Sequence, residues 1–188
     1  MISKPANYDQ ISENGVKKLP MGVYVAIIRG VADDTEKQFL EIEYDIVEPA
    51  EYKGIAAETF QAWGRWAHNF RVYYTEKAMW KLKKFISRLE KTNQGFTFNW
   101  NNPQCLVNRG IGLIIGYRQY YSGKDGGLRE APDVQDFCTA KEARTGVIVD
   151  DNGNEKPLPE PKVVYPKTTS PAPKMEELPP DDDGELPF

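Results

Sequence analysis

The chain has 188 residues, 40% of them hydrophobic and 28% charged, and a formal net charge of −4. No segment approaches the roughly 18 apolar residues of a membrane span, and the first residues lack the apolar region of a signal peptide, so we expect no membrane partner. One histidine, His68, and two cysteines, Cys105 and Cys138, are too few for a structural zinc site without carboxylate ligands. We therefore expect no metal or cofactor, and we interpret both cysteines as packing residues.

Charge and proline are unevenly distributed along the chain. From Asp150 onward, ten acids and four lysines give a net charge of −6, so residues 1–149 carry +2. The same segment holds nine of the fourteen prolines and only one aromatic residue before Phe188. It buries too little apolar surface to offset its ordering entropy, so residues 150–188 are predicted to form a disordered tail. The part of the chain before the tail is mildly basic, which is compatible with a nucleic-acid partner.

Two strands are predicted first. Residues 22–32 are apolar on both faces, as in a well-covered strand. Residues 38–47 alternate, which predicts a half-buried strand. Its inward residues would be Leu40, Ile42, Tyr44 and Ile46, and its outward residues Glu41, Glu43 and Asp45.

Residues 58–71 are predicted to form the third strand. Phe60, Trp66, His68 and Phe70 share one parity, while Trp63, Arg65, Asn69 and Arg71 share the other. The second set is aromatic and cationic, so this strand is a candidate binding surface.

A helix is predicted from an N-cap at Thr75 to about Lys91. Its apolar stripe is typical of a core-facing helix and consists of Ala78, Met79, Leu82, Phe85, Ile86 and Leu89. Its opposite face is basic and carries Lys77, Lys81, Lys84 and Arg88. Solvation is the simplest interpretation of that face, and auxiliary phosphate contact is the alternative.

The rest of the domain is predicted to be a loop at residues 93–103, a strand at 105–121, a hairpin loop at 122–127, a strand at 131–138 and a short helix at 141–144. Three strands, a helix and a hairpin follow the order of an OB-fold. We therefore predict a mainly β protein with three parts. An N-terminal arm spans residues 1–20. A five-stranded OB-fold barrel with one α-helix between strands 3 and 4 spans residues 21–149, and the tail spans 150–188.

The chain ends in an acidic run followed by a Leu-Pro-Phe carboxylate: Asp181, Asp182, Asp183, Gly184, Glu185, Leu186, Pro187 and Phe188. This tip resembles the terminal peptide of bacterial single-stranded DNA-binding proteins, although that family usually has isoleucine after its aspartates. The resemblance implies a docking peptide for replication, recombination or repair enzymes. A negatively charged strip can be steered to a basic surface, where a terminal ring can fill a pocket. An ordinary solvated acidic tail is the alternative.

Within the domain, residues 76–82, 110–115, 123–127 and 136–146 are similar to a family of bacteriophage proteins from phages of Gram-positive hosts, regarded as single-stranded DNA-binding proteins. The resemblance implies non-sequence-specific binding and protection of single-stranded DNA during phage DNA replication and recombination, in the cytoplasm of a bacterial host. Tetrameric and simpler relatives both exist, so homo-oligomerisation stays open.

Binding of this kind needs aromatic faces for stacking and cations for phosphates. Candidate DNA-binding residues are Trp63, Arg65, Arg71, Arg118, Tyr120, Lys124 and Arg129. Two other functions stay open. One is an adaptor that recruits enzymes without binding DNA. The other is a metal-dependent nuclease built on Glu41, Glu43 and Asp45, although a solvated face is the simpler interpretation of these acids. We expect no enzymatic activity.

Overall fold

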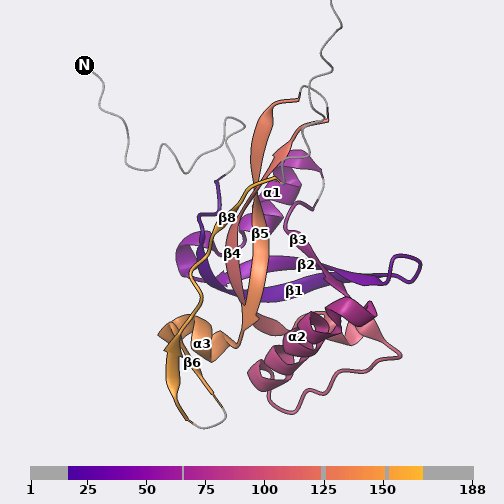
Figure 1. Cartoon of the computed structure of the whole chain (residues 1–188), viewed down its shortest axis with the longest axis vertical. Coiled ribbons are helices and arrows are strands. Elements are labelled where there is room, and N and C mark those ends of the chain that lie inside the picture. Colours follow the sequence, from indigo (N-terminus) through magenta and orange to yellow (C-terminus); the bar gives the residue numbers. More distant parts are fainter. Residues whose placement is uncertain (1–16, 65, 124–125, 151–152, 167–188) are drawn as a thin grey trace, which may run out of the picture.

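The computed structural model describes residues 17–64, 66–123, 126–150 and 153–166. Five main strands form one antiparallel sheet in the order β3-β2-β1-β4-β5 (Figure 1). Their bounds are β1 Gly22–Asp34, β2 Phe39–Glu48, β3 Asn69–Tyr73, β4 Gly110–Tyr121 and β5 Leu128–Cys138. Helices α1, Ile55–Trp63, and α2, Met79–Thr92, lie between strands, and α3, Ala140–Thr145, follows β5. The predicted mainly β class is confirmed.

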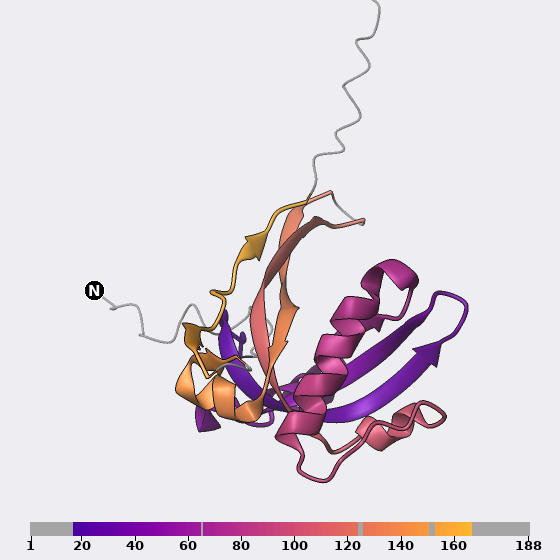
Figure 2. The ribbon, with the colours of Figure 1, turned by 60° about the horizontal axis from the view of Figure 1, so that its bottom comes forward.

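Strand β1 is the centre of the sheet because it pairs with β2 on one side and β4 on the other. Its apolar faces are covered accordingly, with Tyr24, Val25, Ala26 and Ile28 buried. The predicted inward set of β2 is buried as well, so the alternation in its sequence indicated the correct face. Figure 2 shows the β1–β2 and β4–β5 hairpins projecting from a common base as two arms, with α2 between them in this view.

The core connects the two edge strands of the sheet through α2. Phe85 of α2 packs against Phe70 of β3 and Phe137 of β5, with ring centroids 5.8 and 5.1 Å away, and Phe70 and Phe137 are 5.5 Å apart. Leu82, Ile86 and Leu89 complete the buried stripe of α2 as predicted. Met79 is an exception, since it is 44% exposed.

Residues 55–63 form helix α1, so the predicted strand over residues 58–71 is wrong in its first half. The helix lies between Gly54 and Gly64, which both have left-handed backbone conformations (φ 82° and 67°). Buried residues Ile55, Ala56 and Thr59 have helical spacing, and two of them precede the predicted strand. Strand β3 begins only at Asn69.

Asp45 has the parity predicted for it, but it is 2% exposed rather than solvated. Its Oδ1 accepts hydrogen bonds from the backbone N–H groups of Ile46 (2.9 Å) and Ala56 (3.0 Å). The second bond satisfies an amide in the first turn of α1, where a carboxylate also complements the helix dipole. Asp45 is therefore buried because α1 begins against this end of β2.

Other element bounds also differ from those predicted. Helix α2 begins at Met79, after a 3-10 turn at Glu76–Ala78, so its start lies beyond the predicted cap at Thr75. A 3-10 turn at Pro103–Leu106 precedes β4, which starts at Gly110. The hairpin and the terminal helix lie where they were predicted. Within the described ranges, no helix is long and apolar enough to cross a membrane.

The segment after α3 is structured well beyond the predicted boundary at residue 149. Strand β6, Val147–Val149, pairs with β7, Glu155–Pro157, so the boundary falls inside a hairpin. Strand β8, Val163–Val164, then pairs in parallel with β4. The described part of the predicted disordered tail therefore contains strands as far as residue 164. Residues 181–188 lie outside the described ranges.

His68 gives a testable dependence of stability on pH. It is buried beside Tyr44, with ring centroids 5.7 Å apart, and burial lowers its pKa below the ordinary value, although nearby Asp45 opposes the shift. Below about pH 6.5 the unfolded chain binds a proton that the folded chain does not, so the free energy of unfolding should fall as pH drops. The slope from this residue is at most about 1.4 kcal/mol per pH unit.

Urea unfolding of the wild type and of His68→Phe at about pH 7.5 and about pH 5.5 measures this contribution. The phenylalanine keeps a ring beside Tyr44 but cannot bind a proton. The wild type should lose more stability on acidification than the variant. An equal loss in both proteins would assign the pH dependence to other groups.

Candidate nucleic-acid interface

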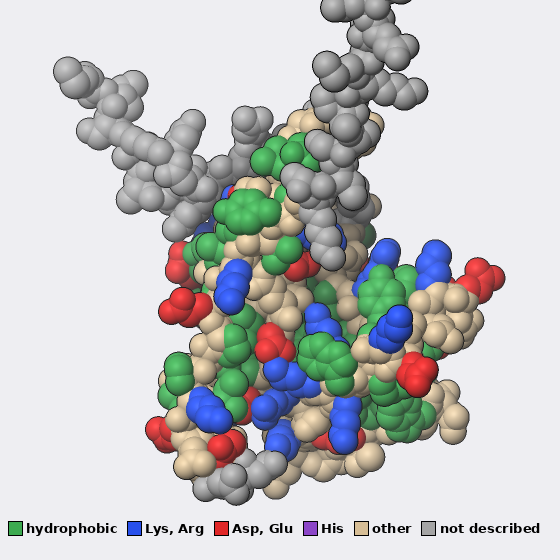
Figure 3. Space-filling view, viewed as in Figure 1, with side chains coloured by type: hydrophobic (Ala, Val, Ile, Leu, Met, Phe, Trp, Pro, Cys, Tyr) green, Lys and Arg blue, Asp and Glu red, His purple; other side chains and the backbone are tan. Residues whose placement is uncertain are grey.

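A groove of about 680 Å³ lies between the two edges of the sheet. Strand β3 lines one side, and β5 with part of β4 lines the other. The groove is lined by Ala67, Asn69, Phe70, Arg71, Tyr73, Lys81, Arg118, Ala131, Pro132, Asp133, Val134, Gln135, Lys162 and Val164. Four of these side chains are cationic and one is a carboxylate. Figure 3, which has the view of Figure 1, shows Lys and Arg side chains gathered over the lower middle of this face, with Asp and Glu side chains nearby.

The β4–β5 arm turns one basic and aromatic face toward this groove. Arg118 and Tyr120 are two residues apart on β4 and therefore share a face. Their partners on β5 are Ala131 and Arg129, respectively. Arg118 and Ala131 line the groove, so this face is the groove side of the arm. The structure thus brings together three predicted DNA-binding residues, Arg118, Tyr120 and Arg129, in a stripe that runs outward from the groove.

The opposite wall comes from the exposed residues of β3: Asn69, Arg71 and Tyr73. Arg71 Nε donates a hydrogen bond to Glu41 Oε2 (2.8 Å), and its guanidinium lies 4.6 Å from the centroid of the Phe39 ring. The hydrogen bond with Glu41 raises the pKa of Arg71, which therefore stays charged. Because Glu41 offsets part of that charge, Arg71 attracts an anion less strongly than an unpaired arginine would.

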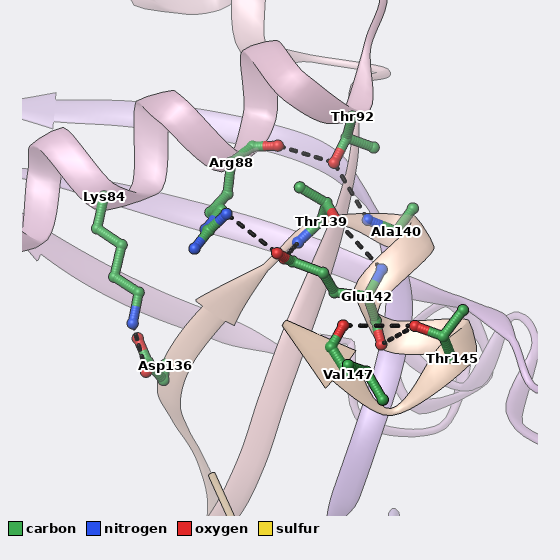
Figure 4. Close-up of polar contacts among 9 residues, drawn as sticks. All are labelled: Lys84, Arg88, Thr92, Asp136, Thr139, Ala140, Glu142, Thr145 and Val147. Atoms are coloured by element: carbon green, nitrogen blue, oxygen red, sulfur yellow. Dashed lines mark hydrogen bonds and ion pairs between the residues drawn. The ribbon is translucent and has the colours of Figure 1, made fainter. Parts of the chain in front are cut away.

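The predicted basic face of α2 is divided between two roles. Lys81 lines the groove, with its Nζ 5.7 Å from the centroid of the Phe137 ring. Lys84 and Arg88 instead form ion pairs with Asp136 (2.6 Å) and Glu142 (3.1 Å), as Figure 4 shows. The interpretation of a uniformly solvated face is therefore wrong for Lys84 and Arg88, which hold α2 against β5 and α3.

Glu142 joins that contact to the start of α3 (Figure 4). Its carboxylate accepts the Thr139 backbone N–H (2.7 Å), and the Thr139 hydroxyl accepts the Glu142 N–H (3.1 Å), which forms a capping box. Thr92 Oγ1 donates to the Arg88 carbonyl (2.7 Å) and accepts from the Ala140 N–H (3.2 Å). These groups stabilise the scaffold behind the groove.

The other predicted site residues lie at the end of helix α1 or outside the described ranges of the chain. Trp63 is the last residue of α1 rather than part of a strand. Arg65, Lys124 and all the predicted partner-docking residues, Asp181, Asp182, Asp183, Glu185, Leu186, Pro187 and Phe188, lie outside the described residues.

The site prediction missed Tyr73, Lys81 and Lys162 as lining residues. Tyr73 has the same parity as Arg71, so the alternation of β3 could have indicated it. Lys81 lies on the predicted basic face of the helix, but no local pattern shows that it reaches the groove. Lys162 belongs to a segment predicted to be disordered.

The predicted outward acids do not converge on one point. Asp45 is buried against α1, while Glu41 is paired with Arg71. In the part of the chain that the structure describes, no group of three or more His, Cys, Asp or Glu side chains is arranged to hold a metal ion.

No protein-family model matches this chain, and no curated protein matches it in sequence.

Proposed function

We propose that strands β1 to β5 and helix α2 form an OB-fold that binds single-stranded DNA without sequence specificity. The order of the elements supports the fold, because α2 stands between β3 and β4, and β1 pairs with both β2 and β4. In OB-folds, oligonucleotides bind across the face of strands 2 and 3, between the loops that join strands 1 to 2 and 4 to 5. Those loops correspond here to the tips of the two arms.

The observation that carries the proposal is the composition of the groove. Arg71, Lys81, Arg118 and Lys162 supply cations, and Tyr73, which is 42% exposed, supplies a ring in the groove. Tyr120, which is 41% exposed, supplies a second ring on the stripe that runs outward from the opposite wall. A nucleic-acid strand needs this combination, since its phosphates attract cations and every base offers a face for stacking. Rings of this kind do not distinguish one base from another, which favours sequence-independent binding.

The biological role that we propose is protection of single-stranded DNA during phage DNA replication, recombination and repair, in the cytoplasm of a bacterial host. The tip at residues 181–188 would recruit partner enzymes by its acidic run and terminal ring. The protein would bind and recruit rather than catalyse. An adaptor that recruits enzymes without binding DNA is the second candidate, because the tip alone supports that role.

A salt titration of binding to oligo-thymidine tests the proposed function. Each neutralised phosphate should contribute about −0.7 to the slope of log affinity against log salt concentration. If the four lining cations each neutralise one phosphate, the slope should be about −3. Binding should be weaker to duplex DNA of the same length.

The competing functions give different results in the same assay. A flat salt response, or equal affinity for duplex DNA, would contradict the proposed function. No complex at all would favour the adaptor. Degradation of the oligonucleotide after Mg²⁺ is added would support the nuclease.

A further inference from the structure

Residues 158–166, which we call the strap, form part of the wall of the groove although they follow the proposed domain. Val163 and Val164 of the strap pair in parallel with Tyr117 and Arg118 of β4. The Tyr117 N–H donates to the carbonyl of Lys162 (3.1 Å). At the start of the strap, the Leu158 N–H donates to the Gly146 carbonyl (3.0 Å). Strand β5 occupies one edge of β4 at Tyr117 and Arg118, so the strap binds the other edge, beyond the point where the pairing with β1 ends at Ile115.

A single side chain, Gln135, clamps the strap to the arm. Its Nε2 donates to the Lys162 carbonyl (2.6 Å), and its Oε1 accepts the Lys162 N–H (2.9 Å). Gln135 is the extra residue of a bulge, because Ile114 pairs with Asp136 while Ile115 pairs with Val134. Bulges re-aim side chains, and this bulge directs the Gln135 amide across β4 to the backbone of Lys162.

Because Gly116 has no side chain, the Gln135 amide and the Lys162 carbonyl can lie directly over its Cα atom. A Cβ atom at position 116 would overlap both the Gln135 amide and the Lys162 carbonyl oxygen. Glycine at this point of β4 thus permits the close approach of the strap backbone. A β-bulge, a glycine and a bidentate amide all serve the same contact, although the strap pairs with β4 over only two residues.

The clamp fixes Lys162 beside the predicted DNA-binding residues. Lys162 and Val164 line the groove together with Arg118, which pairs with Val164. Asp133 is the carboxylate that lines the same groove. The strap therefore adds a cation to a wall that also contains an acid.

We infer that the strap is a component of the DNA-binding site, in which Lys162 contacts a phosphate and Gln135 is the positioning residue that holds Lys162 in place. The inference rests on the proposed function. It extends the site beyond residue 149, into the segment that leads to the acidic tip. Gln135 carries no charge, so its effect on DNA binding has to act through the position of Lys162.

The test compares salt dependence of oligo-thymidine binding among full-length variants. Lys162→Gln should make the slope less steep by about 0.7, because one phosphate contact is lost. Lys162→Arg should keep the wild-type slope. Gln135→Ala should reduce the slope by the same amount, although it removes no charge. Gly116→Ala should make the slope less steep as well, because its methyl group would displace the Lys162 carbonyl from β4. Combining Gln135→Ala with Lys162→Gln should give no further reduction.

Two matched variants control for composition. Gln119→Ala removes a glutamine on the other face of β4, where its amide bonds to Glu130 (2.8 Å). Lys156→Gln removes the same charge from β7, where Lys156 does not line the groove. Both should keep the wild-type slope.

Hydrogen exchange at the Tyr117 amide reports whether the strap is bound, independently of DNA. Gln135→Ala and Gly116→Ala should speed this exchange. Faster exchange with an unchanged slope would show that the strap lies outside the DNA site and overturn the inference. Unchanged exchange in both variants would overturn the clamp. If the wild type itself does not bind oligo-thymidine, the proposed function fails before the strap is in question.

Discussion

Replacing Arg118 and Tyr120 together with alanine is expected to weaken binding of single-stranded DNA by roughly 100-fold, with little change in thermal stability. Loss of one stacked base costs about 1 to 3 kcal/mol, and loss of a phosphate contact adds to it, while each 1.4 kcal/mol is tenfold in affinity. Tyr120 is 41% exposed and Arg118 is exposed as well, so neither substitution opens a cavity in the core.

The same strand supplies the control. Gln119 and Tyr121 alternate with the first pair and lie on the other face of β4, and Tyr121 is 62% exposed. The double variant Gln119→Ala/Tyr121→Ala changes the arm to a similar extent but leaves the groove side intact. Fluorescence anisotropy with labelled oligo-thymidine should show near wild-type affinity for this variant. Equal losses in both double variants would mean that DNA contacts the tip of the arm without a preferred face.

Local periodicity predicted the parts of the fold in which one face meets the core. In β2 the alternation of Leu40, Ile42 and Tyr44 with charged residues indicated both strand and face. In α2 the spacing of Leu82, Phe85 and Leu89 did the same for a helix. In such segments a single burial direction acts on every residue, so the pattern of the sequence and the pattern of burial coincide.

The alternation of hydrophobic and charged residues predicted burial wrongly where a second element covers part of a strand. Asp45 lies on the predicted face of β2, but α1 covers that end and uses the carboxylate as a hydrogen-bond acceptor. Nothing within β2 distinguishes Asp45 from Glu41. The relevant information lies about ten residues further along, in the helical spacing of Ile55, Ala56 and Thr59, which the strand prediction for residues 58–71 did not include.

The candidate site could be predicted where its residues lie on strands whose alternation is visible in the sequence, which are β3 with Arg71 and the β4–β5 hairpin. Arg118, Tyr120 and Arg129 are neighbours across β4 and β5, and the turn between these strands sets their register. Lys162 reaches the same groove because the segment that follows it pairs in parallel with β4, which is distant in the sequence. The composition of that segment resembles that of a disordered tail. Pairing between distant segments depends on geometry that the folded domain creates, here the bulge at Gln135 and the space at Gly116.

Substituting Phe188 with alanine is expected to remove most of the association with replication or recombination enzymes while leaving DNA affinity unchanged. Under the proposed function the terminal ring anchors the tip in a partner's pocket, and a single aromatic anchor can contribute most of the energy of such a contact. The substitution changes no charge, so the electrostatic balance between the tail and the basic groove stays as it was. Tyr165→Ala is a matched control for partner association alone, because it removes an exposed ring from the strap and leaves the tip intact.

Deleting residues 181–188 should have a different effect on DNA. It removes Asp181, Asp182, Asp183 and Glu185, which can otherwise compete with phosphates for the groove, so DNA affinity should stay the same or rise. Partner association should be lost along with the Phe188 ring and the steering charge. Pull-downs from host lysate with full-length, Phe188→Ala, Tyr165→Ala and truncated proteins, next to anisotropy on the full-length, Phe188→Ala and truncated proteins, separate the two roles. If all four proteins recovered the same partners, the acidic tip would be a solvated tail and recruitment would have to come from the domain.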